Sequence, residues 1–417
     1  MLPQIAVSLH CCAESINLEN YRVLVGDELV DEIYRLSQDL RGLRICQINA
    51  TASGGGVAEL LNRQIPIYRA LGLRVDWRII RGDKDFFTIT KKFHNGLQGA
   101  AFGLISAVTQ QYMNQNRLGA EMIEDEYDLY VVHDPQPAAL RHFIPENKAK
   151  WIWRCHIDSS TPNPEVWRFL RPLIELYDAS VFTMEDFRPP DLKMSRVAYL
   201  PPAIDPFATK NMLLPDNLCR KAVADSGINL REPLLLQVSR FDPWKDPLGV
   251  IRAYQLVKEH RPGIQLALVG AMAGDDPEGW EILETINAEA LKDPNLHIFT
   301  NLTGVGNMEV NVFQRGATLV IQKSLKEGFG LVVSEAFWKE KPVVAGKAGG
   351  IPMQFPVAGQ EYLVGSVEEC ASKLVFLLDH PDAAAELGRA GRERVRQEFL
   401  IPRLIRDELR LIRELVA

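Results

Sequence analysis

Short apolar runs alternate with longer stretches of helical spacing along most of this chain, and these runs predict β-strands. In the first half the predicted strands are residues 43–49, 74–81, 129–133, 151–156, 179–183 and 197–200. In the second half they are residues 234–238, 265–270, 296–300, 319–322 and 342–345. Strand, helix and strand at this spacing are typical of βαβ units with parallel sheets. The pattern therefore predicts an α/β protein built from two doubly wound halves.

Helical spacing and composition predict where these halves begin and end. The predicted helices include residues 21–41, 57–71, 247–260 and 331–339, and the charged stretch 382–417 is helical without a strand. The alternation pauses at the proline-rich segment 201–206, which is followed by polar, turn-rich residues 207–232. Linkers favour such segments. We expect a first domain over residues 1–205, a second over 206–395, and a C-terminal helix over 396–417 that packs back on the first.

Composition narrows the class of protein. A chain of 417 residues exceeds what one hydrophobic core usually supports. A net charge of −7 argues against nucleic acid as the main partner, and no run reaches the roughly 18 apolar residues that span a bilayer. The N-terminus lacks the features of a secretion signal. The six cysteines are scattered without a CxxC pair, which favours reduced, buried thiols. We therefore expect a cytoplasmic protein with neither a membrane nor a nucleic-acid partner.

Two cations follow the first predicted strand of the second half. Arg240 and Lys245 come directly after residues 234–238, at the strand end where open α/β sheets bind ligands. A guanidinium fork and a mobile ammonium suit a diphosphate. Two surface cations beside a turn would explain the same residues, so the pair alone does not decide between these readings.

Two glutamates follow the strand at residues 319–322. Glu327 stands before Gly328 and Gly330, which free the backbone to present a helix N-terminus to an anion. Glu335 lies eight residues further on, within the predicted helix. A carboxylate can accept hydrogen bonds from neighbouring sugar hydroxyls. Ordinary solvated charge would explain Glu335, but it does not explain the glycines around Glu327.

Three polar segments of the first half are less specific. The turn Ser53-Gly54-Gly55-Gly56 fits an anion site and a plain tight turn equally well. His133-Asp134 and the segment from Arg154 to Asp158, with His156, stand at strand ends, where a lone histidine is more often structural than functional. Asp83-Lys84-Asp85 is predicted to be a surface turn, and no cluster has metal-ligand spacing.

Together these segments resemble the retaining glycosyltransferases of family 4. The family pattern matches Ser239-Arg240-Phe241, Lys245, residues 327–330 and Glu335-Ala336. Within that family the chain is similar to the trehalose glycosyltransferring synthases at residues 54–59, 93–99, 133–137, 151–158, 237–245, 275–280 and 300–305. The resemblance spans almost the whole chain. It implies the GT-B fold, in which two Rossmann-like domains face a central cleft.

The resemblance also implies an activity and roles for residues. It implies reversible transfer of glucose from NDP-glucose to D-glucose, with retention, to form α,α-trehalose and NDP. The catalytic residues it implies are Arg240, Lys245, Glu327 and His156. The residues it implies for the donor are Gly328, Phe329, Gly330, Leu331, Glu335, Gly55 and Gly56. Those it implies for the acceptor are His133, Asp134 and Arg154.

Several expectations stay open at this point. The resemblance implies a homodimer with small-molecule substrates, no tightly bound cofactor and no metal site, with Mg²⁺ at most as a stimulating ion. A trehalose phosphorylase, a family 4 transferase with another sugar acceptor, and a non-catalytic sugar-binding protein are the alternatives. Lys323 and Lys326 depart from the broader family, and they either strengthen phosphate binding or are simply exposed.

Overall fold

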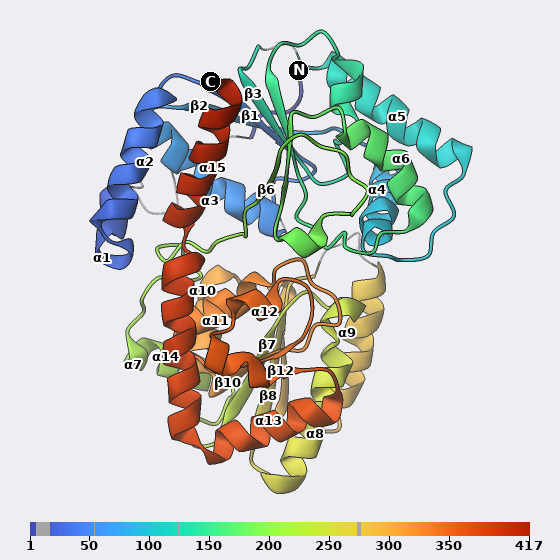
Figure 1. Cartoon of the computed structure of the whole chain (residues 1–417). Helices are drawn as coiled ribbons and strands as arrows, with labels where there is room; N and C mark the ends of the chain where they lie inside the picture. The colour runs from blue at the N-terminus through green and yellow to red at the C-terminus, as the bar shows by residue number, and fades with distance from the viewer. Residues whose placement is uncertain (6–16, 54, 124–125, 273–276) are drawn as a thin grey trace. The chain divides into compact units, whose positions relative to one another are not determined.

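The computed structural model describes residues 1–5, 17–53, 55–123, 126–272 and 277–417 (Figure 1). Gly54, Cys11, Cys12 and the pair Asp275-Asp276, which entered the sequence interpretation, lie outside the described residues. The chain divides into two compact units. Unit 1 comprises Met1–Pro202 and Ile401–Ala417, and unit 2 comprises Ala203–Leu400.

Unit 1 is built on a six-stranded sheet with the order β2-β1-β3-β4-β5-β6, in which every pair is parallel. Its strands are β1 (Arg44–Asn49), β2 (Arg74–Ile79), β3 (Leu129–His133), β4 (Lys150–Arg154), β5 (Ala179–Phe182) and β6 (Val197–Tyr199). Most of their side chains are buried, as parallel sheets with helices on both faces require. The strand order reverses direction between β1 and β3.

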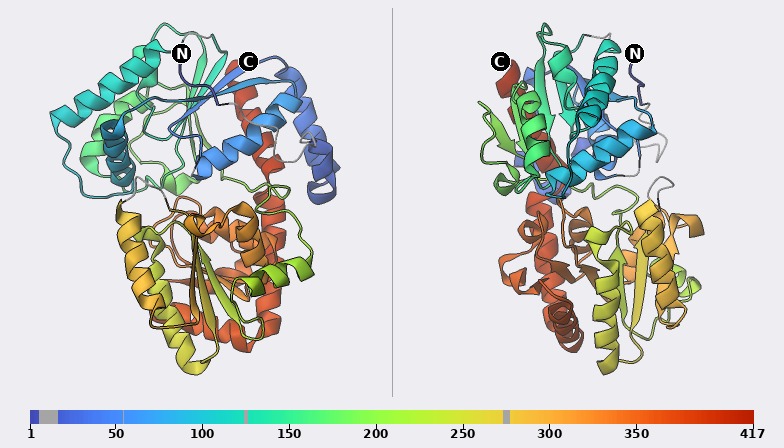
Figure 2. Two further views of the ribbon diagram at one scale, coloured as in Figure 1. Left: turned by 180° about the vertical axis from the view of Figure 1, so that it is seen from behind. Right: turned by 90° about the vertical axis from the view of Figure 1, so that its right-hand side faces the viewer.

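The helices of unit 1 lie on both faces of this sheet (Figure 1). They are η1 (Leu18–Tyr21), α1 (Arg22–Val25), α2 (Asp27–Asp39), α3 (Gly56–Ala70), α4 (Lys84–Leu97), α5 (Ser106–Glu121), η2 (Leu140–Phe143), α6 (Pro164–Ile174), η3 (Glu185–Phe187) and α15 (Ile401–Val416). The last of these, α15, packs along α2, as the red and blue helices of Figure 2 show. Ion pairs from Arg410 to Glu32 and from Arg413 to Asp39 join the two helices.

Unit 2 holds a second parallel sheet, with the order β12-β11-β10-β7-β8-β9. Its strands are β7 (Leu234–Val238), β8 (Gln265–Gly270), β9 (Leu296–Thr300), β10 (Leu319–Gln322), β11 (Val343–Gly346) and β12 (Leu363–Val364). Its helices are α7 (Asp216–Asp225), η4 (Pro243–Lys245), α8 (Pro247–His260), α9 (Pro277–Ala290), η5 (Asn301–Thr303), α10 (Asn307–Gly316), α11 (Leu331–Trp338), α12 (Ile351–Gln354), η6 (Val357–Tyr362), α13 (Val367–Asp379) and α14 (Pro381–Glu398). The order is that of a Rossmann fold, and it reverses between β7 and β10.

The predicted fold class is confirmed, with local corrections. The segment expected to be a turn-rich linker contains α7. Asp83 does not form a plain turn, because its side chain caps α4 by accepting a hydrogen bond from the Phe86 amide at 2.7 Å. The C-terminal stretch is two helices, since Leu400 pairs with Ile204 as a β-bridge between α14 and α15. The units divide after Pro202 and Leu400, whereas the sequence suggested limits after residues 205 and 395.

The structure bears on two expectations drawn from composition, which concern the cysteines and membrane-spanning segments. Cys155, Cys219 and Cys370 are buried free thiols, which confirms the expectation for these three cysteines. In the part of the chain that the structure describes, no helix combines the length and the apolar character needed to cross a membrane.

Candidate functional site

The reversal between β7 and β10 places the polar segments of unit 2. In doubly wound sheets, ligands bind beyond the carboxyl ends of the strands at the point where the strand order reverses. The residues that follow Val238 and Gln322 leave the sheet at this point. Two segments that are about eighty residues apart in the sequence therefore meet there.

Lys245 and Glu327 form the centre of this group. The Lys245 ammonium donates a hydrogen bond to Glu327 Oε2 at 2.6 Å, and both side chains are largely buried. The Ser324 hydroxyl approaches the same oxygen at 3.3 Å. Among the described residues, Glu327 Oε1 has no hydrogen-bond partner and is left to accept one from a ligand. The ammonium likewise keeps N–H groups for an anion, since it carries three.

A second ion pair joins the same two segments. Lys323, which follows β10 and is only 4% exposed, is paired with Asp246, the residue after Lys245. Asp246 also caps α8 by accepting a hydrogen bond from the Gly249 amide at 3.0 Å. Its backbone has φ of 47°, a left-handed conformation that is unusual for a residue other than glycine. Lys323 is therefore neither exposed nor available to a phosphate, and it holds the two segments together.

The other cations of this group are closer to solvent. The Lys326 ammonium lies 4.8 Å from the centre of the Trp244 ring, and the Trp244 carbonyl accepts a hydrogen bond from the Leu325 amide at 2.7 Å. The Arg240 side chain is 53% exposed and approaches Asp242 at 3.4 Å. Its guanidinium is thus accessible to an anion, as the predicted role in diphosphate binding requires.

The glycine-rich loop and α11 position Glu327 from the other side. Gly330 has φ of 81° and precedes α11, and a Cβ there would lie 3.2 Å from Glu327 Cγ. Gly328 accepts a hydrogen bond from the Gly350 amide at 3.0 Å. Leu331 begins the helix, so its amide stands at the helix N-terminus. The loop is therefore packed closely around Glu327, and only small residues fit beside it.

Two residues predicted for the donor are buried. The Phe329 ring is packed 5.4 Å from that of Phe399, which leaves only its backbone for a ligand. Glu335 is 1% exposed, with Oε1 paired to Lys210 at 3.2 Å and Oε2 accepting a hydrogen bond from Gln314 at 3.3 Å. The Glu335 carboxylate is therefore almost inaccessible to a ribose in this structure.

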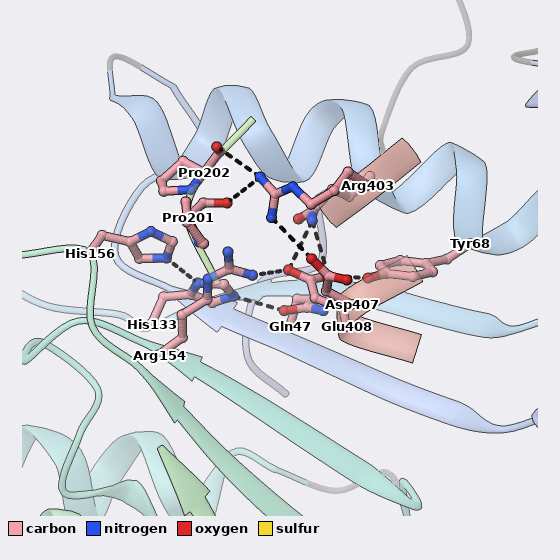
Figure 3. Close-up of polar contacts among 11 residues, drawn as sticks. Gln47, Tyr68, His133, Arg154, His156, Pro201, Pro202, Arg403, Asp407 and Glu408 are labelled. Atoms are coloured by element: carbon pink, nitrogen blue, oxygen red, sulfur yellow. Dashed lines mark hydrogen bonds and ion pairs between the residues drawn. The ribbon is translucent and has the colours of Figure 1, made fainter. Parts of the chain in front are cut away.

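In unit 1 the strand order reverses between β1 and β3, and the predicted histidines lie beside this point (Figure 3). His133 ends β3 and is 1% exposed. Its Nε2 lies 2.7 Å from Gln47 Oε1 on β1, and its Nδ1 lies 2.9 Å from His156 Nε2. The imidazole rings stack with centres 5.3 Å apart. The structure thus joins two histidines that the sequence presented separately.

Asp134 and Arg154 complete this cluster. The Asp134 carboxylate accepts a hydrogen bond from the His156 amide at 2.8 Å, and its backbone has φ of 62°. Burial raises the pKa of Asp134 to about 7, against the lowering effects of that hydrogen bond and of the Arg154 charge. Burial, together with the same positive charge, lowers the pKa of both His133 and His156 well below its usual range. Both imidazoles are therefore neutral near pH 7.

Arg154 is paired with a carboxylate of the C-terminal helix (Figure 3). Its Nη1 is paired with Glu408 of α15, and the same carboxylate accepts hydrogen bonds from Tyr68 and from Gln64, the latter at 3.0 Å. Arg154 is buried, so it acts on its surroundings mainly through its charge and not through an exposed contact with an acceptor. Sequence reasoning missed Glu408, although it stands in the apolar stripe of Ile401, Leu404, Ile405, Leu409 and Ile412.

The glycine turn before α3 differs from those of unit 2. Gly55 precedes α3 with an extended backbone at φ of −152°, and a Cβ there would meet no atom within 4 Å. Neither the backbone conformation nor packing therefore requires glycine at this position. Gly55 and Gly56 are both exposed.

Glutamines at the strand ends form a further group that the sequence interpretation missed. Gln237 of β7 donates to the Lys245 carbonyl at 2.8 Å, and Gln322 of β10 donates to Ser324 Oγ at 3.1 Å. Gln47 occupies the corresponding position on β1. A glutamine that interrupts or ends an apolar run is the signal that could have identified them.

Comparison with known proteins agrees with this layout. Residues 47–189 match the family described as trehalose synthase, N-terminal domain, and residues 220–394 match glycosyl transferases group 1. A trehalose synthase of Rubrobacter xylanophilus is 50% identical over 96% of this chain and 97% of its own. A trehalose phosphorylase of Pleurotus pulmonarius is 27% identical over 83% of this chain but 54% of its own. The crystal structure of an α,α-trehalose 6-phosphate synthase from Burkholderia multivorans superposes with a TM-score of 0.70 at 17% identity, over 90% of this chain and all of that one, which establishes the GT-B fold.

Proposed function

Because this chain belongs to the trehalose synthase family of glycosyltransferases, we propose that it converts NDP-glucose and D-glucose to α,α-trehalose and NDP. The observation that carries the proposal is the contact between Lys245 and Glu327 where the strand order of unit 2 reverses. This contact supports the proposal because a cation that suits a phosphate lies beside a carboxylate oxygen that can accept a hydrogen bond from a sugar hydroxyl. A donor that joins glucose to a diphosphate presents both groups to such a pair.

The proposed chemistry follows from where charge develops. As the bond between the anomeric carbon and the phosphate oxygen breaks, negative charge accumulates on the diphosphate, and Arg240 and Lys245 stabilise it. The acceptor hydroxyl attacks from the same face and forms the new glycosidic bond, and its proton passes to the departing phosphate oxygen. Configuration is thereby retained without a carboxylate nucleophile. The hydrogen bond from Lys245 makes Glu327 a weak nucleophile and a suitable hydroxyl acceptor.

We assign sugar recognition in unit 1 to His156 and Asp134. Gln47 and His156 occupy both ring nitrogens of His133, which therefore orients His156. The neutral imidazole of His156 and the buried carboxyl of Asp134 offer hydrogen bonds to hydroxyls and add no full positive charge. The unpacked glycine at position 55 supports a close backbone approach to the substrate. Arg154 contributes an electrostatic field beside these groups.

Product analysis tests the proposal directly. The full chain is incubated with D-glucose and, separately, UDP-, ADP- and GDP-glucose, and the disaccharide is identified by NMR. A single symmetric α,α-linked disaccharide with stoichiometric NDP is expected. Another linkage, or trehalose cleavage by inorganic phosphate without a nucleotide, would refute the proposal, and the second outcome would favour the phosphorylase reaction of the more distant relative.

Substitutions test the assigned residues. Lys245→Ala and Glu327→Ala are each expected to lower kcat by about 10²–10³, the usual effect of losing one group that stabilises transition-state charge. Lys373→Ala is the matched control, because Lys373 forms a comparable 2.9 Å ion pair with Glu361 at the surface of the same unit. Near-normal turnover of both variants, with folding verified by circular dichroism, would contradict the site assignment.

A further inference from the structure

A continuous chain of hydrogen bonds runs from Gln47 through His133 to His156 (Figure 3). The amide oxygen of Gln47 lies 2.7 Å from His133 Nε2, and His133 Nδ1 lies 2.9 Å from His156 Nε2. Gln47 and His133 are both buried. The two links therefore use three of the four ring nitrogens and leave His156 Nδ1, which has no hydrogen-bond partner among the described residues.

The chemistry of these groups determines which nitrogens carry protons. An amide oxygen only accepts hydrogen bonds, so His133 Nε2 must be the donor to Gln47. A neutral imidazole has one N–H group, so His133 Nδ1 is an acceptor and His156 Nε2 must donate to it. If His156 is neutral as well, its Nδ1 has no proton.

The surroundings keep both rings neutral. Burial opposes protonation of either ring, and the positive charge of the Arg154 guanidinium acts in the same direction. The one carboxyl in this cluster, that of Asp134, accepts a hydrogen bond from the His156 backbone amide at 2.8 Å. Burial favours its protonated form as well, so it provides little negative charge to stabilise an imidazolium.

We infer that Gln47 is a positioning residue that fixes His156 in the tautomer protonated at Nε2, so that Nδ1 is a hydrogen-bond acceptor. A sugar hydroxyl that contacts His156 Nδ1 must then be the hydrogen-bond donor. This inference rests on the proposed function only for the identity of the ligand, since the tautomer is a property of the free protein. It predicts selection against any analogue whose group at that position cannot donate, because sites built to bind a hydroxyl reject analogues that lack it.

The tautomer can be measured without substrate. The full chain has eight histidines, so ¹⁵N-histidine labelling gives few enough NMR signals to resolve, and His156→Asn identifies the signal of His156. We expect the long-range ¹⁵N–¹H pattern of the Nε2–H form for both His133 and His156 in the unmodified protein. An Nδ1–H pattern, or a charged ring at pH 7, for His156 would overturn the inference.

A substitution tests the role of Gln47. Gln47→Met keeps a similar volume but removes the acceptor, so His156 is expected to become a mixture of tautomers. The matched control is Gln64→Met, another buried glutamine of unit 1, which is bonded to Glu408 and not to the histidines, and it should leave the His156 signal unchanged. A His156 signal that is identical in Gln47→Met and the unmodified protein would refute the positioning role. The measurement on the unmodified protein stands even if the variant does not fold.

Substrate analogues provide the functional arm. NDP-glucose and glucose analogues, with one hydroxyl at a time other than the reacting anomeric hydroxyl replaced by fluorine, retain a weak hydrogen-bond acceptor and lose the donor. One analogue should lose at least tenfold in kcat/KM with the unmodified protein, and that loss should shrink in Gln47→Met. Equal use of all analogues would overturn the donor–acceptor assignment. Failure of the proposed function would be distinct, since no nucleotide sugar would then react while the NMR result remained.

Discussion

Removal of the Glu408 carboxylate should destabilise unit 1 from a position on the C-terminal helix. Glu408 is paired with Arg154 and accepts hydrogen bonds from Tyr68 and Gln64. Glu408→Ala would leave the Arg154 charge buried without a counter-ion, and it would leave the Tyr68 hydroxyl without its acceptor. Breaking a buried ion pair from one side costs about 3–5 kcal/mol. The hydrogen bonds lost by Tyr68 and Gln64 belong to the same network, so this free-energy cost already includes them.

The expected change in melting temperature is large enough to measure. For a unit of about this size, each kcal/mol corresponds to roughly 2–4 °C, so we expect a decrease of roughly 6–20 °C. Calorimetry measures the transition, and hydrogen exchange of peptides from α15 and β4 assigns it to unit 1. Glu414→Ala is the control on the same helix, because Glu414 is exposed in its ion pair with Arg196 and should cost less than about 1 kcal/mol.

A double substitution separates buried charge from lost packing. Arg154→Met combined with Glu408→Leu removes both charges and retains apolar volume, so it should cost less than Glu408→Ala alone. If the double variant instead loses as much stability as the two single variants together, an uncompensated charge is not the cause and the reasoning is wrong.

Three further outcomes follow from the two units. Asp246→Gly keeps the left-handed backbone but leaves Lys323 buried without its carboxylate, so calorimetry should show a lower melting temperature. Adding Lys323→Met should largely restore the melting temperature. An unchanged melting temperature in Asp246→Gly would exclude a stabilising role for the Lys323–Asp246 pair. Asp134→Asn tests the raised pKa. The folded chain holds a proton on Asp134 between pH 3.8 and about 7 that the unfolded chain releases, so stability falls across this window as pH rises. The urea midpoint of the variant minus that of the unmodified protein should therefore increase from pH 4 to pH 7 and then stay constant. A difference that does not depend on pH would contradict the raised pKa of Asp134. Arg240→Lys keeps the charge but loses the planar fork, so kcat/KM for NDP-glucose should fall about tenfold, as expected for one lost charge-assisted hydrogen bond of roughly 1.5 kcal/mol, with little change in melting temperature.

Local sequence pattern was sufficient for most of the strands and for the strand ends that carry the candidate site residues. The apolar runs at residues 129–133, 234–238 and 265–270 are strands with the predicted limits, because buried parallel strands need continuous apolar stretches. The exception at the far edge, β12, is two residues long and has no such run. Lys245 and Glu327 became candidates because polar residues in the loops after such runs stand where α/β sheets bind ligands, whereas His133 became a candidate only through the family resemblance.

Only the tertiary structure decided which of these residues touch. Arg154 and Glu408 are 254 residues apart in the sequence, and Lys245 and Glu327 are 82 apart. Their contacts depend on strand order and on the packing of α15, and periodicity within one segment carries no information about either. The same reason explains Lys323, which local pattern left open between a phosphate ligand and an exposed charge. Its partner Asp246 lies beyond a neighbouring strand, so only the order of β7 and β10 brings the two charges together.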